Sequence, residues 1–87
     1  GFGEWELLET GFNSILGMRY SWKGRSLFIW HNFSESSQEI FITARKAGTD
    51  RLVDLMNNIE SEANAKGRHT ITLEAYGYRW FRDKGLR

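Results

Sequence analysis

Alternation of apolar and polar residues is the main pattern along this chain, and it predicts short β-strands. The clearest case is 15–22, whose even positions are apolar: Leu16, Met18, Tyr20 and Trp22. A period of two predicts a half-buried strand. Residues 26–32 are almost all apolar, as in a strand covered on both faces. Lys23-Gly24-Arg25 lies between these two runs and predicts a tight β-hairpin.

Four further segments have strand-like composition, and breaks separate them along the chain. They are residues 4–9, 39–44, 69–73 and 78–82. The serine-rich break at 33–37 leads into 39–44, which we expect to be the third strand of a meander that starts with the hairpin. Six or more short strands with turns at short intervals indicate an all-β fold, an antiparallel sandwich or barrel.

The segment from Thr49 to Gly67 satisfies two conflicting patterns. Its apolar residues fall at helical spacing: Leu52, Val53, Met56, Ile59 and Ala63. Thr49 and Gly67 could cap the two ends of such a helix. Against a helix, Asn57-Asn58 is a turn-forming pair in its middle, and residues 51–55 also fit a strand. The residues alone leave both alternatives open.

Composition limits the class of protein. Eighty-seven residues suffice for one domain, 1–87, and the chain has no cysteine for disulfides or thiolate metal ligands. A formal charge of +1 gives no strong field to attract nucleic acid or anionic lipid. No apolar run approaches the ~20 residues of a membrane-spanning helix, and the N-terminus has no signal-peptide pattern. We therefore expect a cytoplasmic protein with neither a nucleic-acid nor a membrane partner.

No catalytic, metal-binding or cofactor-binding constellation stands out among the reactive residues. The acids include Glu4, Glu6, Glu9, Asp54 and Glu74, which we expect to face water on strands rather than to pair across a glycosidic bond. His31 and His69 lie near no serine or carboxylate at a telling spacing; we expect His31 to end a strand and His69 to begin one. Gly1-Phe2-Gly3 has no preceding strand, so it is no phosphate loop.

The aromatic residues are the most informative group. Thirteen of them exceed what one small core can hide, so some should face a partner. Trp22 and Trp30 have apolar strand neighbours and are predicted to lie in the core or in a contact with another domain. Trp5 and Trp80 remain as candidates for contact with carbohydrate or with another domain, because an indole face can cover a sugar. Residues 78–82 mix aromatics with arginines, which strand alternation explains more simply than nucleic-acid binding.

Several segments, taken in order, resemble the C-terminal domain of trehalose synthase-like enzymes. These enzymes are maltose glucosylmutases of the α-amylase superfamily, glycoside hydrolase family 13. The resemblance covers nearly the whole chain and rests on Gly1-Phe2-Gly3-Glu4-Trp5, Leu8-Glu9-Thr10-Gly11, Trp22-Lys23-Gly24-Arg25-Ser26, His31-Asn32-Phe33-Ser34, Arg51-Leu52-Val53-Asp54-Leu55, Gly67-Arg68-His69 and Tyr76-Gly77-Tyr78-Arg79-Trp80-Phe81-Arg82.

The resemblance implies an antiparallel β-sandwich of about seven or eight strands with Greek-key connections. It implies a catalytic (β/α)8 barrel upstream of Gly1 that carries the catalytic acids, so this chain would be non-catalytic and would stabilise the barrel. An α-glucan is the alternative partner, which exposed tryptophans would bind. The family also favours a strand at 51–55, although residues 57–66 depart from it and leave a helical turn open there.

Overall fold

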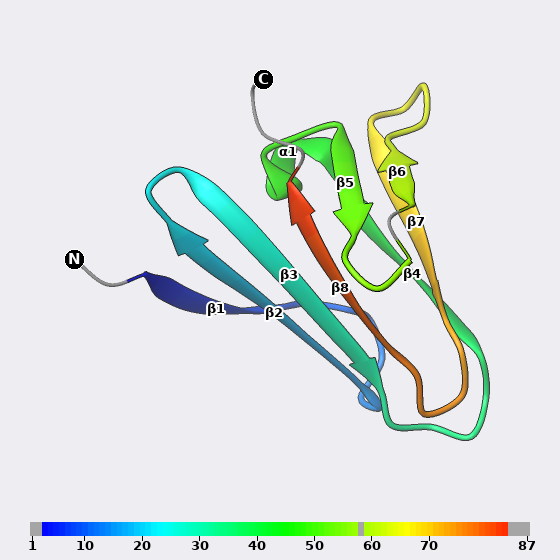
Figure 1. Ribbon diagram of the computed structural model, residues 1–87. Coiled ribbons are helices and arrows are strands. Elements are labelled where there is room, and N and C mark those ends of the chain that lie inside the picture. Colours follow the sequence, from blue (N-terminus) through cyan, green and yellow to red (C-terminus); the bar gives the residue numbers. More distant parts are fainter. Residues whose placement is uncertain (1–2, 58, 84–87) are drawn as a thin grey trace.

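The computed structural model describes residues 3–57 and 59–83, which form an antiparallel β-sandwich (Figure 1). The elements are β1 (Glu4–Leu8), β2 (Ile15–Trp22), β3 (Arg25–Asn32), β4 (Gln38–Thr43), α1 (Ala44–Ala47), β5 (Arg51–Asp54), β6 (Glu60–Glu62), β7 (Arg68–Leu73) and β8 (Tyr78–Asp83). A large sheet has the order β1-β2-β3-β8-β5-β6, and a small sheet pairs β4 with β7. The predicted all-β sandwich is confirmed.

The strand after the hairpin does not continue a meander, so that expectation was wrong. β4 pairs with β7 in the small sheet, and β8 takes the place beside β3. The pairing of β3 with β8 extends to the last residue of β3, where the Asn32 N–H donates to Gly77 O at 2.8 Å. Because β2 and β8 occupy both edges of β3, the chain after Asn32 must cross to the other layer.

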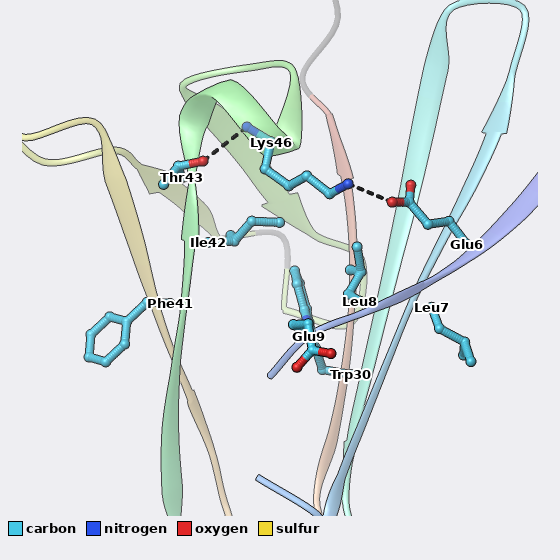
Figure 2. A pocket seen from close by; sticks show the side chains of 9 residues that line it. All are labelled: Glu6, Leu7, Leu8, Glu9, Trp30, Phe41, Ile42, Thr43 and Lys46. Carbon is cyan, nitrogen blue, oxygen red and sulfur yellow. Dashed lines mark hydrogen bonds and ion pairs between the residues drawn. The ribbon is translucent and has the colours of Figure 1, made fainter. Parts of the chain in front are cut away.

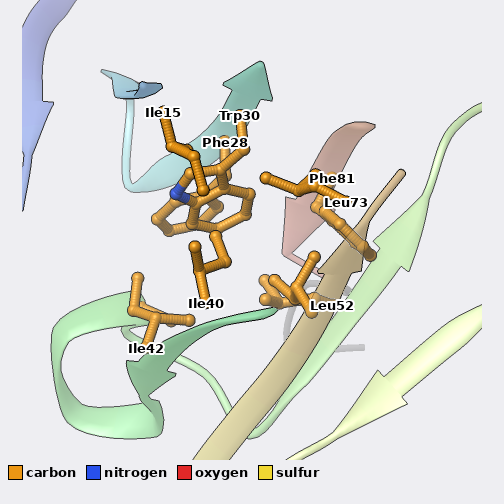
Figure 3. Packing of buried hydrophobic residues seen from close by; sticks show 10 residues of the cluster. Ile15, Phe28, Trp30, Ile40, Ile42, Leu52, Leu73 and Phe81 are labelled. Atoms are coloured by element: carbon orange, nitrogen blue, oxygen red, sulfur yellow. The ribbon is translucent and has the colours of Figure 1, made fainter. Parts of the chain in front are cut away.

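The core lies between the sheets and is centred on two rings of β3 (Figure 3). Phe28 and Trp30 stack with centroids 5.6 Å apart, and Phe81 of β8 meets Trp30 edge-on at 5.9 Å. The small sheet covers them with Ile40, Ile42, Ile71 and Leu73. Trp30 is only 2% exposed, which confirms it as a core residue.

The apolar even positions of β2 face away from the core. Ile15 and Gly17 are the buried residues of this strand, whereas Trp22 is 46% exposed, so a core position, one of its two predicted environments, is wrong. Gly17 explains the choice of face: a Cβ there would lie 2.8 Å from Trp30 Nε1, so only a residue without a side chain fits over this indole. The odd face therefore packs on the core.

The disputed segment forms strands rather than a helix. β5 pairs with β8 on one side and with β6 on the other, so the predicted strand at 51–55 is confirmed. Among the described residues of 51–66 there is no helix; Asn58 lies outside them. The only helix described is α1, where a strand end was expected. Thr43 caps it by accepting the Lys46 N–H, and Gly48 ends it at φ 78°.

Within the described residues, no helix is long and apolar enough to cross a membrane.

We predict that Gly17→Ala destabilises the domain by about 1–3 kcal/mol, because the added methyl overlaps the Trp30 indole and forces the core to shift. Urea unfolding followed by tryptophan fluorescence measures this. Leu16→Ala removes atoms from the opposite face of the same strand and should cost less. Equal losses for the two variants would show that the contact between Gly17 and Trp30 does not set the face of β2.

Candidate docking face and seam groove

The outer face of the large sheet, which points away from the small sheet, carries a row of apolar side chains across four strands. Strand register places Leu7, Met18, Ile29 and Trp80 directly opposite one another on β1, β2, β3 and β8. The Leu55 N–H donates to Trp80 O at 2.8 Å and extends the row past β5. An antiparallel sheet with one solvated face normally alternates apolar and polar residues, and this sheet does not.

A second row runs parallel to the first and contains Trp5, Tyr20 and Leu27. The Trp5 and Tyr20 rings have centroids 4.8 Å apart. Trp5 is 58% exposed and Trp80 is 40% exposed. The structure thus brings both candidate tryptophans to one face, on strands separated by β2 and β3, in neighbouring apolar rows.

The exposed face of the small sheet is different in character. Its outward positions include Glu39, Thr70 and Thr72, and its one large ring, Phe41, has the Arg68 guanidinium 4.4 Å from its centroid. Charged and hydroxyl side chains therefore cover this face. Of the two outer faces of the sandwich, only that of the large sheet is broadly apolar.

A groove of about 390 Å³ opens at the seam between β1 and β4 (Figure 2). Leu8, Ile42 and Trp30 form its apolar floor, and an ion pair between Glu6 of β1 and Lys46 of α1 bridges its mouth. The hydrogen bond from Lys46 holds the pKa of Glu6 below its usual value. The nearly buried Trp30 offers no ring face to a ligand in this groove.

Asp54 departs from the sequence prediction that it faces water, because it is buried at the end of β5. Its carboxylate accepts hydrogen bonds from the Met56 N–H at 2.8 Å and from Arg79 Nη1 at 2.9 Å, and also from Asn57. Arg79 in turn donates to Thr72 O at 2.9 Å, which ties the two sheets together. The only sequence signal for this site was the turn-forming Asn57 itself.

The pKa of Asp54 is lowered, because two opposing effects act on the carboxyl. Burial disfavours the charged form, but the hydrogen bonds from the Met56 N–H, from Arg79 and from Asn57 outweigh it. A group with a lowered folded-state pKa stabilises the fold above its unfolded pKa, near 3.9 for Asp, and loses this contribution as the pH falls through the folded value.

We therefore predict that Asp54→Asn lowers the free energy of unfolding at pH 7 by about 1–3 kcal/mol, because an amide cannot replace the charged acceptor. The difference from the parent sequence should shrink as the pH falls below about 4. Urea unfolding at a series of pH values measures it, with the exposed Glu4→Gln as control. A difference that stays constant down to pH 2 would contradict the assigned role.

The two histidines lie in β3 and β7, and the structure does not bring them together. His69 is buried, with Nε2 3.3 Å from Thr49 O and Nδ1 3.0 Å from Ser61 Oγ. A carbonyl oxygen can only accept, so Nε2 donates to it. His31 stacks on Phe33 at 4.1 Å. No group of three or more His, Asp or Glu that could hold a metal occurs within 3–57 and 59–83.

Comparison with known structures shows the same fold as a part of much longer chains. AmyP in complex with maltotriose matches with a TM-score of 0.84 at 15% identity, over 98% of this chain and 17% of that one. An α-amylase from Geobacillus thermoleovorans in complex with acarbose gives 0.79 at 13% identity, over 95% and 19%. A putative α-galactosidase from Bacteroides fragilis gives 0.68 at 11%, over 87% and 17%. This chain thus spans less than a fifth of each.

A comparison with curated protein sequences finds no match. One family model does match, over residues 24–82, and it describes the C-terminal domain of sucrose hydrolase-like proteins.

Proposed function

Because the chain belongs to the family of sucrose hydrolase-like C-terminal domains, we propose that it is the non-catalytic β domain of a larger enzyme of the α-amylase superfamily. In this proposal the outer face of the large sheet packs against the catalytic barrel of the same polypeptide and stabilises it. The observation that supports this most directly is the apolar row from Leu7 to Trp80, which no part of the described chain covers.

The central strand of the sheet shows why such a face needs a covering layer. β3 buries Phe28 and Trp30 on its inner side, yet its outer side carries Leu27 and Ile29, which are only partly buried. Complete removal of one large apolar side chain from water is favourable by a free energy of about 1.5–3 kcal/mol. Contacts between domains of one chain typically cover about 600–1,500 Å².

The reaction of the parent enzyme is a finer part of the proposal. The resemblance to trehalose synthase-like enzymes supports action on small α-glucosides such as maltose and trehalose in the cytoplasm. That resemblance rests on the ordered set of segments that ends with residues 76–82. An assay of the whole parent enzyme with maltose, trehalose and sucrose would identify the reaction.

The docking proposal predicts how the whole parent protein responds to charge on the outer face. The double variant Leu7→Lys/Trp80→Lys should separate the thermal unfolding of this domain from that of the barrel, so that one calorimetric transition becomes two. The reason is that two buried ammonium groups would oppose the contact. Differential scanning calorimetry measures the outcome.

Thr70→Lys is the matched control, since it adds the same charge to an exposed strand position on the polar face of the small sheet. It should leave the single transition intact. The test requires a parent protein that unfolds in one transition. If the double variant keeps that single transition, as Thr70→Lys should, the outer face does not dock on the barrel.

Glucan binding by Trp5 and Trp80 is the second candidate function. Both indoles are exposed enough to stack on a sugar, but their neighbours across the strands are apolar: Tyr20 beside Trp5, and Ile29 beside Trp80. Sugar recognition needs hydrogen-bonding partners for the hydroxyl groups as well as a ring face. These apolar cross-strand neighbours favour docking over glucan binding; the hydrogen-bonding groups near Trp80 are those of Tyr78 and Arg82 on the same strand.

We also predict that the isolated chain does not convert or hydrolyse maltose or trehalose. Glycoside chemistry requires two carboxyl groups across the scissile bond, and in this chain Asp54 is engaged by Arg79 while Glu6 is paired with Lys46. Product analysis by chromatography after long incubation tests it. Turnover that disappears in Glu9→Gln or in another single acid variant would overturn the non-catalytic assignment.

A further inference from the structure

Two loops meet at one end of the sandwich, and a single buried amide fixes both. Asn32, fully buried at the end of β3, donates from Nδ2 to Ser36 O at 2.8 Å and to Glu74 O at 3.0 Å. Its Oδ1 accepts from the Ser34 N–H at 2.9 Å. The loops at 33–37 and 74–77 are also joined directly, by the Tyr76 N–H donating to Ser34 O. This end of the fold is therefore preorganised.

The two loops and the adjoining strand ends present a set of exposed aromatic residues, here called the aromatic corner: His31, Phe33, Tyr76 and Tyr78. His31 stacks on Phe33 and meets Tyr78 edge-on, with centroids 5.5 Å apart. The phenylalanine and both tyrosines are at least half exposed. Stacking against one another orients these rings without hiding them.

Tyr76 occupies a backbone conformation that its side chain does not favour. Its φ is 56°, in the left-handed region, where a bulky residue is rare and glycine or asparagine is preferred. Its side chain is 65% exposed, so backbone hydrogen bonds of the turn, among them Tyr76 N–H to Ser34 O, hold this conformation rather than packing of the ring. Strained residues cluster at ligand-binding sites, so Tyr76 marks this loop as a candidate site.

We propose that the aromatic corner is a binding site for the pyranose rings of an α-glucan. Flat exposed rings suit the apolar faces of sugars. The exposed Glu35 and Glu74 beside these rings supply carboxylate groups that sugar hydroxyls need, whereas the rows of Trp5 and Trp80 contain no carboxylate. The choice of α-glucan as the ligand rests on the proposed function; the position of the site does not.

The isolated chain, titrated with maltoheptaose, tests this by amide chemical shifts and calorimetry. Saturable shifts should fall at 31–37 and 74–78. Tyr76→Asn should raise the melting temperature by relieving the backbone and weaken binding at least tenfold. Tyr76→Phe keeps the ring and the strain, so it should bind within about threefold of the parent sequence, because stacking carries the affinity.

Three results would overturn the proposal. They are no saturable shift, shifts centred on Trp5 or Trp80, and Tyr76→Asn that binds as tightly as Tyr76→Phe. If the corner instead docks on the barrel, Tyr76→Asn should split the unfolding of the whole parent protein into two transitions, as expected for Leu7→Lys/Trp80→Lys. That outcome would also overturn the glucan-binding proposal. The titration uses the isolated chain and the docking test uses the parent, so the two proposals fail separately.

Discussion

The close approach of Gly17 to the Trp30 indole is the constraint on which the rest of this structure depends. Trp30 fills the centre of the core, and only a strand with no side chain at the facing position can lie over it. That requirement sets which face of β2 turns inward. The even positions of β2 must then point outward, where they join the apolar residues of β1, β3 and β8. The core and the outer face are thus two consequences of one packing contact.

Two buried polar side chains, Asn32 and Asp54, fix the conformation of the loops. Asn32 closes the loops at one end, and Asp54 closes the turn after β5 while holding Arg79 against the small sheet. Each is surrounded by donors or acceptors of the backbone, so each fixes chain direction as well as satisfying its own burial. The small sheet is held over the core by these bonds in addition to apolar packing.

Local pattern predicted the strands of this fold better than it predicted their faces. Alternation located the hairpin and the last two strands because side-chain direction is a local property of a strand. The inward face of β2 could not be found in the same way, since Gly17 meets Trp30 from a different strand. The same holds for 49–67, where helical spacing was outweighed by pairing of β5 with β8. Asp54 was misassigned because its partner Arg79 lies far along the chain.

The exposure of the outer face follows from the size of the domain. A chain this short buries only about 60–65% of the surface of its unfolded form. One layer of core, between two sheets of unequal width, uses Phe28, Trp30 and Phe81 and leaves the other described rings at least partly exposed. Those on the large sheet gather in rows because strand register aligns them. His31 and Tyr78 form the row next to Ile29 and Trp80, and the loops held by Asn32 add Phe33 and Tyr76 at its end. The outer face of the large sheet therefore combines apolar rows suited to a protein domain with an aromatic corner, flanked by Glu35 and Glu74, that is suited to a sugar.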